Sequence, residues 1–253
     1  MTRIFLSGCN GKMGGVIASC VQSRNDCQVV AGADINAAPR GDFPVFPFPA
    51  AFNGECDVII DFSHPNALPG LLDYALGTGT PLVMATTGFN DSHIAQLKAA
   101  ADRIPVFFSF NMSLGINLLV SLAQKAAVIL PGFDIEIVES HHNQKIDAPS
   151  GTAIMLADGI SSALPQKPAY EYDRHSKRKK RPANEIGIHS VRGGTIVGEH
   201  EVVFAGHDEV ITLKHTAFSK EIFAVGAINA ALFLSKMPAG FYSMKDLVDH
   251  NDA

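Results

Sequence analysis

Short apolar runs alternate with amphipathic segments along the first hundred residues. The runs have the length of buried strands, and the segments between them repeat apolar residues with the period of a helix. The expected strands are residues 3–7, 28–33, 58–62, 81–85 and 106–110, and the expected helices lie around residues 16–21 and over 66–76 and 92–101. Strands and helices that alternate in this way predict a parallel, doubly wound sheet.

The pattern changes after a long amphipathic helix over 113–129. A strand over 133–138 and a helix around 154–164 follow, and strand-like segments within 186–218 are broken at Gly193-Gly194 and at 206–208. Because short turns separate these segments, antiparallel pairing is expected. An apolar helix over 222–234 and an amphipathic tail over 241–248 should pack back on the first domain. The sequence thus predicts a Rossmann-type domain of residues 1–112 and 223–253, with an inserted α+β domain of residues 113–222 that holds a mixed or antiparallel sheet.

A glycine-rich loop follows the first expected strand. Its glycines Gly8, Gly11 and Gly14 have the spacing G-x-x-G-x-x-G between a strand and a helix, a variant of the dinucleotide fingerprint. Asp34 ends the second strand, where a carboxylate can accept hydrogen bonds from the adenosine ribose. A surface carboxylate is the alternative for Asp34, but the combined pattern favours a dinucleotide site.

Two further turns follow expected strands. They are Thr86-Thr87-Gly88 and Ser109-Phe110-Asn111-Met112. Ligands of doubly wound sheets bind at the carboxyl ends of the strands, so both turns are expected to border the cofactor. Ordinary turn chemistry is the competing interpretation.

The most distinctive stretch is Glu139-Ser-His-His-Asn-Gln-Lys-Ile-Asp-Ala-Pro-Ser-Gly-Thr-Ala153. It lies between an expected strand and a helix for which Ser150 is a suitable N-cap. The free N–H groups of a helix start attract an anion such as a carboxylate, and Lys145 adds a positive charge. If the strand extends through His142, then His141 and His142 point to opposite sides. The alternatives are a simple helix cap, a solvated strand end, and a metal site with Glu139 and His141, which no other Cys/His cluster supports.

Composition and charge limit the classes of function. The chain has 253 residues, of which 47% are hydrophobic, and a net charge of −5, which does not favour nucleic acid as the main partner. The basic run Arg174–Arg181 could bind nucleic acid or anions, but a solvated, mobile loop is expected.

The location is predicted from three further features. No apolar run reaches the roughly 18 residues of a membrane helix, and the N-terminus has no signal-peptide layout. The four cysteines form no CxxC pair and indicate reduced thiols, so a cytoplasmic protein without a membrane partner is expected. Cys9 precedes a helix, where a thiol pKa can fall, although a small residue in a tight turn is the favoured interpretation.

The stretch Glu139–Ala153 resembles the signature of the 4-hydroxy-tetrahydrodipicolinate reductase (dihydrodipicolinate reductase) family. The resemblance continues through Gly8–Gly14, Thr86–Phe89, Asn111–Asn117 and Val191–Ala205. It implies a homotetrameric oxidoreductase of lysine and diaminopimelate biosynthesis that reduces a cyclic dicarboxylate with NADH or NADPH. It also implies the site: His141 as general acid, Lys145 as a second catalytic and substrate-binding charge, the further substrate-binding residues His142, Ser150, Gly151 and Thr152, no metal ligand, and the cofactor-binding residues Gly8, Cys9, Asn10, Gly11, Lys12, Met13, Asp34, Ala85, Thr86, Thr87, Gly88, Ser109, Phe110, Asn111 and Met112.

Two departures from the family pattern concern the cofactor. Met112 stands where some members carry an aromatic residue, so thioether packing on the nicotinamide is expected there. Asp34 is followed by Ile35 and Asn36, and only Lys12 and Arg40 are nearby cations for the 2′-phosphate of NADPH. NADH is therefore predicted to be preferred, with NADPH also bound. The alternatives are a catalytically silent nicotinamide-binding sensor, a related two-domain dehydrogenase, and a nucleic-acid-binding protein.

Overall fold

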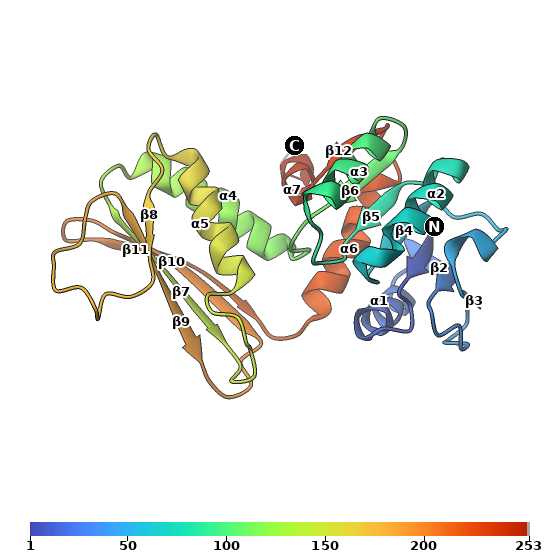
Figure 1. The fold of residues 1–253 in the computed structure, drawn as a ribbon, viewed down its shortest axis with the longest axis horizontal. Helices are drawn as coiled ribbons and strands as arrows, with labels where there is room; N and C mark the ends of the chain where they lie inside the picture. The colour runs from blue at the N-terminus through green and yellow to red at the C-terminus, as the bar shows by residue number, and fades with distance from the viewer. Residues whose placement is uncertain (252–253) are drawn as a thin grey trace. The chain divides into compact units, whose positions relative to one another are not determined.

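The computed structural model describes residues 1–251, which form two compact units (Figure 1). The first unit consists of Met1–Leu114 together with the chain from Glu221 onward, and the second consists of Gly115–Lys220. The chain therefore leaves the first unit once, completes the second unit, and returns.

The first unit is built on a seven-stranded sheet in which every pair of neighbouring strands is parallel. The strand order is β12-β6-β5-β4-β1-β2-β3. Since β2 and β4 flank β1, the chain reverses direction across the sheet at β1, which is the point where such folds bind ligands. The strands are β1 (Thr2–Ser7), β2 (Cys27–Ala33), β3 (Val45–Phe46), β4 (Val58–Asp61), β5 (Leu82–Met84), β6 (Pro105–Phe108) and β12 (Gly240–Tyr242).

Helices cover both faces of this sheet. The helices are α1 (Lys12–Gln22), α2 (Leu68–Thr78), α3 (Asp91–Ala101), α6 (Glu221–Leu234) and α7 (Met244–Asn251), with short 3₁₀ turns η1 (Pro49–Ala51) and η2 (Pro65–Ala67). One core lies between the sheet and α1, α6 and α7, and the other lies between the sheet and α2 and α3. Burial on both faces explains why β4 is apolar at successive positions up to Asp61.

The predicted strands and helices of the first unit are present, with shifts at their ends. The helix expected from residue 66 begins as the 3₁₀ turn η2, and α2 starts at Leu68. Two short strands were not predicted. They are β3, which pairs with β2, and β12, which pairs with β6 ahead of the tail helix α7. Strands of two or three residues are too short to produce a recognisable period.

The second unit has a five-stranded mixed sheet in the order β11-β10-β7-β9-β8. The strands are β7 (Asp134–His141), β8 (Ala169–Glu171), β9 (Glu185–Arg192), β10 (Gly198–Ala205) and β11 (Val210–Ala217). The expected antiparallel pairing holds for β10 with β11, but it is wrong for β9 and β10, because β7 lies between them. β7 pairs antiparallel with β10 and parallel with β9. The short turn at Gly193-Gly194 thus spans one intervening strand.

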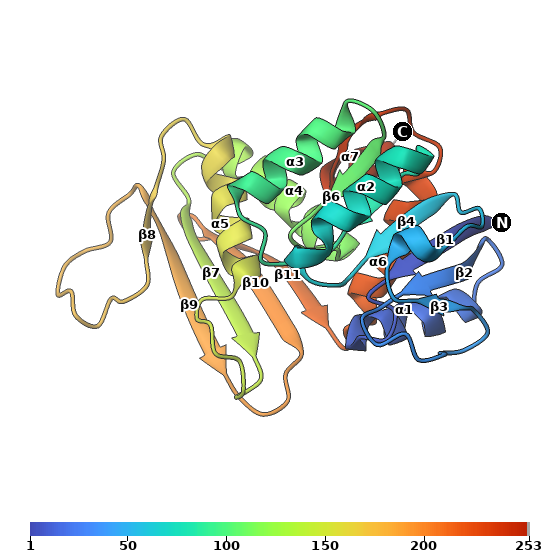
Figure 2. The same cartoon turned by 45° about the vertical axis from the view of Figure 1, so that its right-hand side comes forward.

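Two helices cover one face of this sheet, α4 (Leu114–Ile129) and α5 (Gly151–Ala163), as Figures 1 and 2 show. Their apolar residues pack on side chains that alternate along the strands, for example Ile135 and Ile137 of β7. The next inward-facing residue of β7 is Glu139, which is fully buried. The packed face therefore carries a polar group at the carboxyl end of β7.

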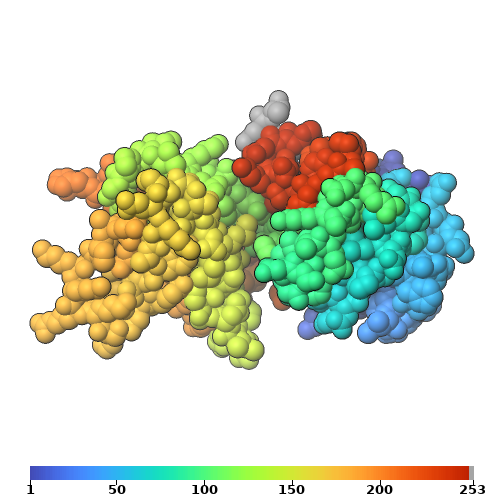
Figure 3. Space-filling view, turned by 45° about the horizontal axis from the view of Figure 1, so that its top comes forward, coloured from blue at the N-terminus to red at the C-terminus, as the bar shows by residue number. Residues whose placement is uncertain are grey.

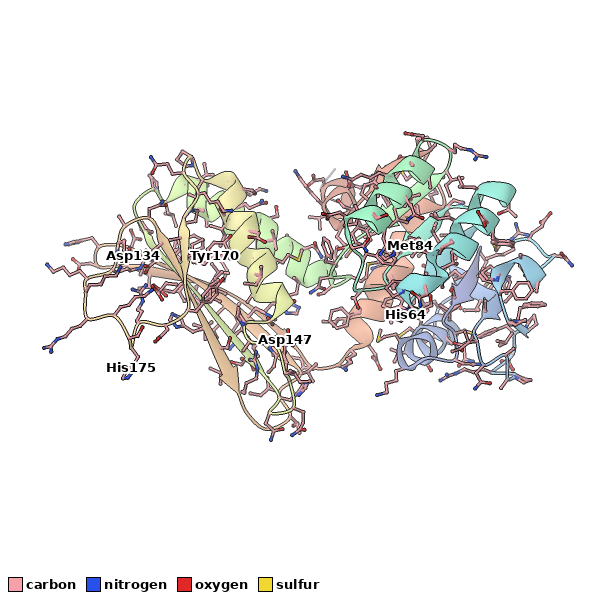
Figure 4. All side chains as sticks on the ribbon, in the orientation of Figure 1. His64, Met84, Asp134, Asp147, Tyr170 and His175 are labelled. Carbon is pink, nitrogen blue, oxygen red and sulfur yellow. The ribbon has the colours of Figure 1, made fainter. Side chains whose placement is uncertain are left out.

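The basic run lies in the loop between β8 and β9, whose side chains (amber) stand at the surface of the second unit (Figure 3). Three of its cations are paired with carboxylates: Arg174 with Glu136 and Glu185, Lys177 with Glu171, and Arg181 with Asp134 and Glu136. The loop is thus anchored to the amino-terminal end of β7, whereas Asp147 of the signature stretch follows the other end, as Figure 4 shows.

Candidate active site

The signature stretch begins on the last residues of β7. Alternation along the strand places Glu139 and His141 on the face that carries the helices, and Ser140 on the other. The Nδ1 atom of His141 lies 2.6 Å from Glu139 Oε2. An ionised carboxylate only accepts hydrogen bonds, so Nδ1 carries the proton and Nε2 is left for chemistry. The two residues considered as metal ligands are thus hydrogen-bonded to each other.

Glu139 is the most heavily bonded carboxylate of the second unit. Arg192 of β9 donates to both of its oxygens, at 2.8 and 2.7 Å, and the Ser150 N–H donates to Oε1 at 3.0 Å. Burial alone would raise the pKa of Glu139. Hydrogen bonds from Arg192, Ser190, His141 and the Ser150 N–H outweigh burial and lower that pKa to about 2.

A buried histidine lies beside His141. His200 of β10 is 4% exposed, and its ring packs edge-on against the His141 ring at 5.2 Å. Burial first, and then the neighbouring His141, lower the pKa of His200 to about 4, so its imidazole is neutral at neutral pH. Gly198 lies close to the free nitrogen of His141, since a Cβ at this position would stand 3.2 Å from Nε2. The glycine keeps space open beside Nε2.

Lys145 lies in the loop that follows β7. Its Nζ pairs with Asp147 Oδ1 at 2.8 Å, and its side chain is 21% exposed. The hydrogen bond from Lys145, ahead of a smaller opposing effect of burial, lowers the pKa of Asp147. His142 lies beyond the last residue of β7 and is half-buried. A partly exposed lysine whose carboxylate partner is 58% exposed can exchange that partner for a ligand carboxylate.

The start of α5 has the geometry of an anion site. Ser150 is the N-cap, and its Oγ accepts the Ala153 N–H at 3.2 Å. Gly151 is exposed, and a Cβ there would meet nothing within 4 Å. The first-turn N–H groups of Gly151 and Thr152 precede the first helical hydrogen bonds, where the helix dipole favours a negative group. Ser150 itself is only 2% exposed.

The glycine loop of the first unit runs from β1 into α1. Gly8 has a φ of +75°, and a Cβ there would stand 2.6 Å from the Phe62 carbonyl oxygen. At Gly14 a Cβ would stand 2.3 Å from the Gly8 carbonyl oxygen. Gly11 is the N-cap of α1 without a side-chain cap, and Lys12 and Met13 open the helix. These contacts make glycine necessary and leave the N–H groups of the first turn for a pyrophosphate.

Asp34 lies beside this loop at the end of β2. Its carboxylate accepts hydrogen bonds from the Asn10 N–H and the Asn36 N–H, each at 3.0 Å. Arg40 reaches the same loop and donates to the Asn10 carbonyl at 3.0 Å. The carboxylate and guanidinium therefore border the same glycine loop. Each Asp34 oxygen retains a lone pair for a ribose hydroxyl.

The remaining predicted cofactor residues follow β5 and β6 at the carboxyl edge of the sheet. Ala85 and Thr86 are buried, Thr87 is exposed, and Gly88 has a φ of +85°. Ser109 Oγ donates to the Asn111 carbonyl at 2.8 Å, Phe110 is 67% exposed, and Asn111 Oδ1 accepts the Ser113 N–H. Met112 is 3% exposed within the core beside α6, so its thioether packs on protein side chains.

Cys9 is fully buried in the core between the sheet and α1. Burial, followed by the charge of Asp34, raises the pKa of its thiol to about 11. The possible lowering of this pKa at the helix start is therefore wrong, because desolvation outweighs the dipole. The Cys9 backbone is part of the glycine loop.

Three polar residues of these sites were not predicted. Arg192 and His200 join Glu139 from neighbouring strands, and only the pairing of β9 and β10 with β7 brings them there. Asp61 ends β4 and is fully buried; it accepts Thr86 Oγ1 at 2.5 Å and Ser63 Oγ at 2.6 Å. A lone carboxylate at the end of an apolar strand was the available signal for Asp61.

Two further properties hold for residues 1–251. Their His, Cys, Asp and Glu side chains form no group of three or more that is arranged to hold a metal ion. None of their helices is both long and apolar enough to cross a membrane.

Models of one protein family match both units. The model described as "Dihydrodipicolinate reductase, N-terminus" matches residues 2–112, and "Dihydrodipicolinate reductase, C-terminus" matches residues 115–248. A 4-hydroxy-tetrahydrodipicolinate reductase of Caldanaerobacter subterraneus subsp. tengcongensis is 52% identical over 248 residues, which cover 98% of each chain. That of Clostridium tetani is 49% identical over 247 residues, 96% of each chain.

Solved structures agree with this assignment. A dipicolinate-bound dihydrodipicolinate reductase from Paenisporosarcina sp. TG-14 superposes with a TM-score of 0.81 at 25% identity, over 96% of this chain and 97% of that one. A DAP dehydrogenase of C. glutamicum has a TM-score of 0.60 at 14% identity, over 98% and 95% of the chains, and shares the fold. The signature stretch, both family models and relatives near 50% identity together show that this chain belongs to the dihydrodipicolinate reductase family.

Proposed function

We propose that this chain reduces 4-hydroxy-tetrahydrodipicolinate, with loss of water, to tetrahydrodipicolinate, in the diaminopimelate route to lysine. The observation that carries the proposal is the placement of His141, Lys145 and the α5 helix start within one stretch of the second unit. The reaction needs a proton donor and groups that bind a dicarboxylate. This stretch supplies both.

His141 acts as the general acid in this proposal. A nicotinamide dinucleotide supplies the hydride when bound, and the ring must then receive a proton on carbon. His141 in its protonated form holds one proton at Nδ1 against Glu139 and can transfer the other from Nε2. Gly198 carries no Cβ that would crowd that nitrogen. After the transfer the imidazole is neutral and keeps its Nδ1 proton.

The substrate carboxylates are held by Lys145 and by the start of α5. Lys145 Nζ exchanges Asp147 for one carboxylate, and the N–H groups of Gly151 and Thr152 donate hydrogen bonds to the other. His142 borders the same loop and contributes a further polar contact. The N–H and the Oγ of Ser150 are already hydrogen-bonded within the protein. Ser150 therefore supports the helix start that binds the carboxylate.

The first unit holds the cofactor, with NADH preferred over NADPH. The residues named from Gly8 to Met112 lie at the carboxyl edge of its sheet, and the glycine loop accommodates a pyrophosphate. Asp34 accepts ribose hydroxyls and repels a 2′-phosphate. Arg40 beside the same loop offers that phosphate a cation, which supports use of both cofactors.

The assembly is a homotetramer in this proposal, joined through the sheets of the second unit. The sheet face opposite α4 and α5 carries Val191 and Val210, which are 46% and 63% exposed. Sheet-to-sheet packing would bury these side chains. Light scattering at micromolar concentration should give about four chains, and a monomer mass would contradict it. The reduced cysteines fit a cytoplasmic enzyme.

A coupled assay tests the function. Pyruvate and aspartate semialdehyde are condensed enzymatically to form the substrate, and NADH absorbance is followed after this chain is added. We expect NADH consumption that depends on both precursors. A purified, folded chain that binds NADH without consuming it would leave the sensor as the better explanation.

A further inference from the structure

We propose that Glu139 is a positioning residue that orients the proton donor and the carboxylate-binding helix start at the same time. Its Oε2 accepts His141 Nδ1 at 2.6 Å, and its Oε1 accepts the Ser150 N–H at 3.0 Å. One carboxylate thus joins two parts of the site that are nine residues apart in sequence. The inference rests on the proposed function of His141 and the α5 helix start.

The position of Glu139 is fixed by a buried ion pair. Arg192 donates to both carboxylate oxygens and also donates to the Asp147 carbonyl at 2.6 Å. The Glu139 side chain is 0% exposed and that of Arg192 is 20% exposed. A charge-assisted pair with two parallel contacts restrains both direction and distance. Arg192 therefore prevents Glu139 from turning away from His141, and it ties the loop before α5 to the sheet.

Glu139 determines which nitrogen of His141 faces the substrate. A free neutral imidazole can place its proton on either nitrogen, and only the form with the proton on Nδ1 leaves Nε2 ready to be protonated again. The carboxylate accepts from Nδ1 and selects that form. A glutamine would present its single oxygen to Arg192 and Ser150 and its NH₂ group to Nδ1. The imidazole would then hold its proton on Nε2, and its protonated form would lose its acceptor.

Glu139 also fixes the start of α5 through Ser150. The Ser150 Oγ accepts the Ala153 N–H and lies 3.0 Å from His200 Nε2. The N–H and the hydroxyl of this buried serine are therefore both hydrogen-bonded within the protein. Its backbone leads directly into Gly151 and Thr152. A shift of Ser150 would move the N–H groups that receive the substrate carboxylate. Proton delivery and anion binding are therefore expected to weaken together when Glu139 is changed.

The experiment compares Glu139→Gln with Glu136→Gln. Glu136 is the matched control, because it lies on the same strand, points to the opposite face and is also ion-paired, with Arg174 and Arg181. We measure kcat in the coupled assay, the Kd of dipicolinate with NADH present, and the Kd of NADH alone. Glu139→Gln should lower kcat by at least ~10²-fold and weaken dipicolinate binding by roughly tenfold, with NADH binding unchanged. Glu136→Gln should stay within about threefold of the unmodified protein in all three.

A spectroscopic measurement does not require the Glu139 variant to fold. In the unmodified protein at alkaline pH, ¹⁵N NMR of the histidine rings should show Nδ1 of His141 protonated and Nε2 unprotonated, with the signal assigned by its loss in His141→Gln. A proton on Nε2 would overturn the inference, as would a folded Glu139→Gln with normal kcat and dipicolinate binding. If the unmodified protein shows no turnover but has the Nδ1 proton, the proposed function fails while the orienting contact stands.

Discussion

The two units each bury a carboxylate at the carboxyl end of a strand, and the pKa values of the two carboxylates shift in opposite directions. Asp61 of β4 is surrounded by hydroxyls, whereas Glu139 of β7 faces a guanidinium and a histidine. Burial raises the pKa of Asp61 and the hydroxyls of Ser63 and Thr86 only partly oppose it. For Glu139 the hydrogen-bond donors outweigh burial, and the pKa falls to about 2. Burial alone thus does not set the direction of the pKa shift, which depends on the hydrogen-bonding partners.

This difference matches the work of the two units. The first unit presents backbone N–H groups, glycines and hydroxyls at the site proposed for the cofactor. The second unit holds a charged carboxylate against a histidine and a lysine-bearing loop, as proton transfer to a dicarboxylate requires. The charged network therefore lies where the proposed chemistry takes place.

The largest expected effect is a difference in the free energy of unfolding between variants of the two carboxylates. The pKa of Glu139 lies below its unfolded value of 4.5, so its stabilisation is present at neutral pH and is lost as the pH falls toward 2. Removing its charge leaves the Arg192 guanidinium without its carboxylate partner, so Glu139→Gln should reduce the free energy of unfolding at pH 7 by up to ~3–5 kcal/mol.

Asp61→Asn should behave differently. The raised pKa means that the stabilisation from Asp61 is present below its unfolded value of 3.8 and is lost as the pH rises. Asparagine keeps an acceptor for the hydroxyls, so the free energy of unfolding at pH 7 should change by less than about 1 kcal/mol. Urea unfolding of both variants measures this difference. Equal losses in the free energy of unfolding would mean that the hydrogen-bonding partners do not determine how the two carboxylates affect stability.

The next effect concerns His200, whose folded pKa of about 4 lies below the unfolded value of 6.5. The unfolded chain binds a proton first, so stability should decrease as the pH falls from 6.5 toward 4, by on the order of 2 kcal/mol. His200→Gln keeps a hydrogen-bonding group for Ser150 and should flatten the unfolding curve between pH 6.5 and 4.5, above the range where Glu139 titrates. An unchanged curve would show that His200 is not buried in neutral form.

Lys145→Ala tests whether the loop after β7, rather than the basic loop between β8 and β9, binds the substrate. Loss of a ground-state charge contact should raise KM and slow turnover, lowering kcat/KM by roughly 10- to 100-fold. The matched control is Lys177→Ala, which removes an ion-paired lysine from the basic loop. Steady-state kinetics of both variants test the assignment. If only NADH affinity changes in Lys145→Ala, Lys145 does not bind the substrate.

The smallest effect tests the first unit. Matched titrations should show tighter binding of NADH than of NADPH, by about 1 kcal/mol, since Asp34 accepts hydroxyls and repels phosphate. Asp34→Ser with Asn36→Arg should move the ratio toward NADPH. Arg40→Ala should weaken NADPH more than NADH, because Arg40 borders the same loop. Tighter NADPH binding by the unmodified protein would contradict the assignment of Asp34.

Much of the architecture could be predicted because the first unit is locally patterned. The five predicted strands of its sheet are short, mainly apolar runs, and the glycines of the loop are required by close backbone contacts at their own positions. The pairing of β7 between β9 and β10 could not be predicted, because strand order depends on contacts far apart in sequence. For the same reason the sequence did not predict the roles of Arg192 and His200, which lie beside Glu139 only because their strands pair with β7.

The kinetics of His141→Gln test the central claim most directly. Turnover in the coupled assay is measured beside the Kd of NADH, so that loss of the proton donor is distinguished from loss of the cofactor. The account predicts a kcat lower by roughly 10²–10⁴-fold with unchanged NADH binding, the range for removal of a general acid. A variant that turns over at a near-normal rate would contradict the assignment of proton transfer to His141.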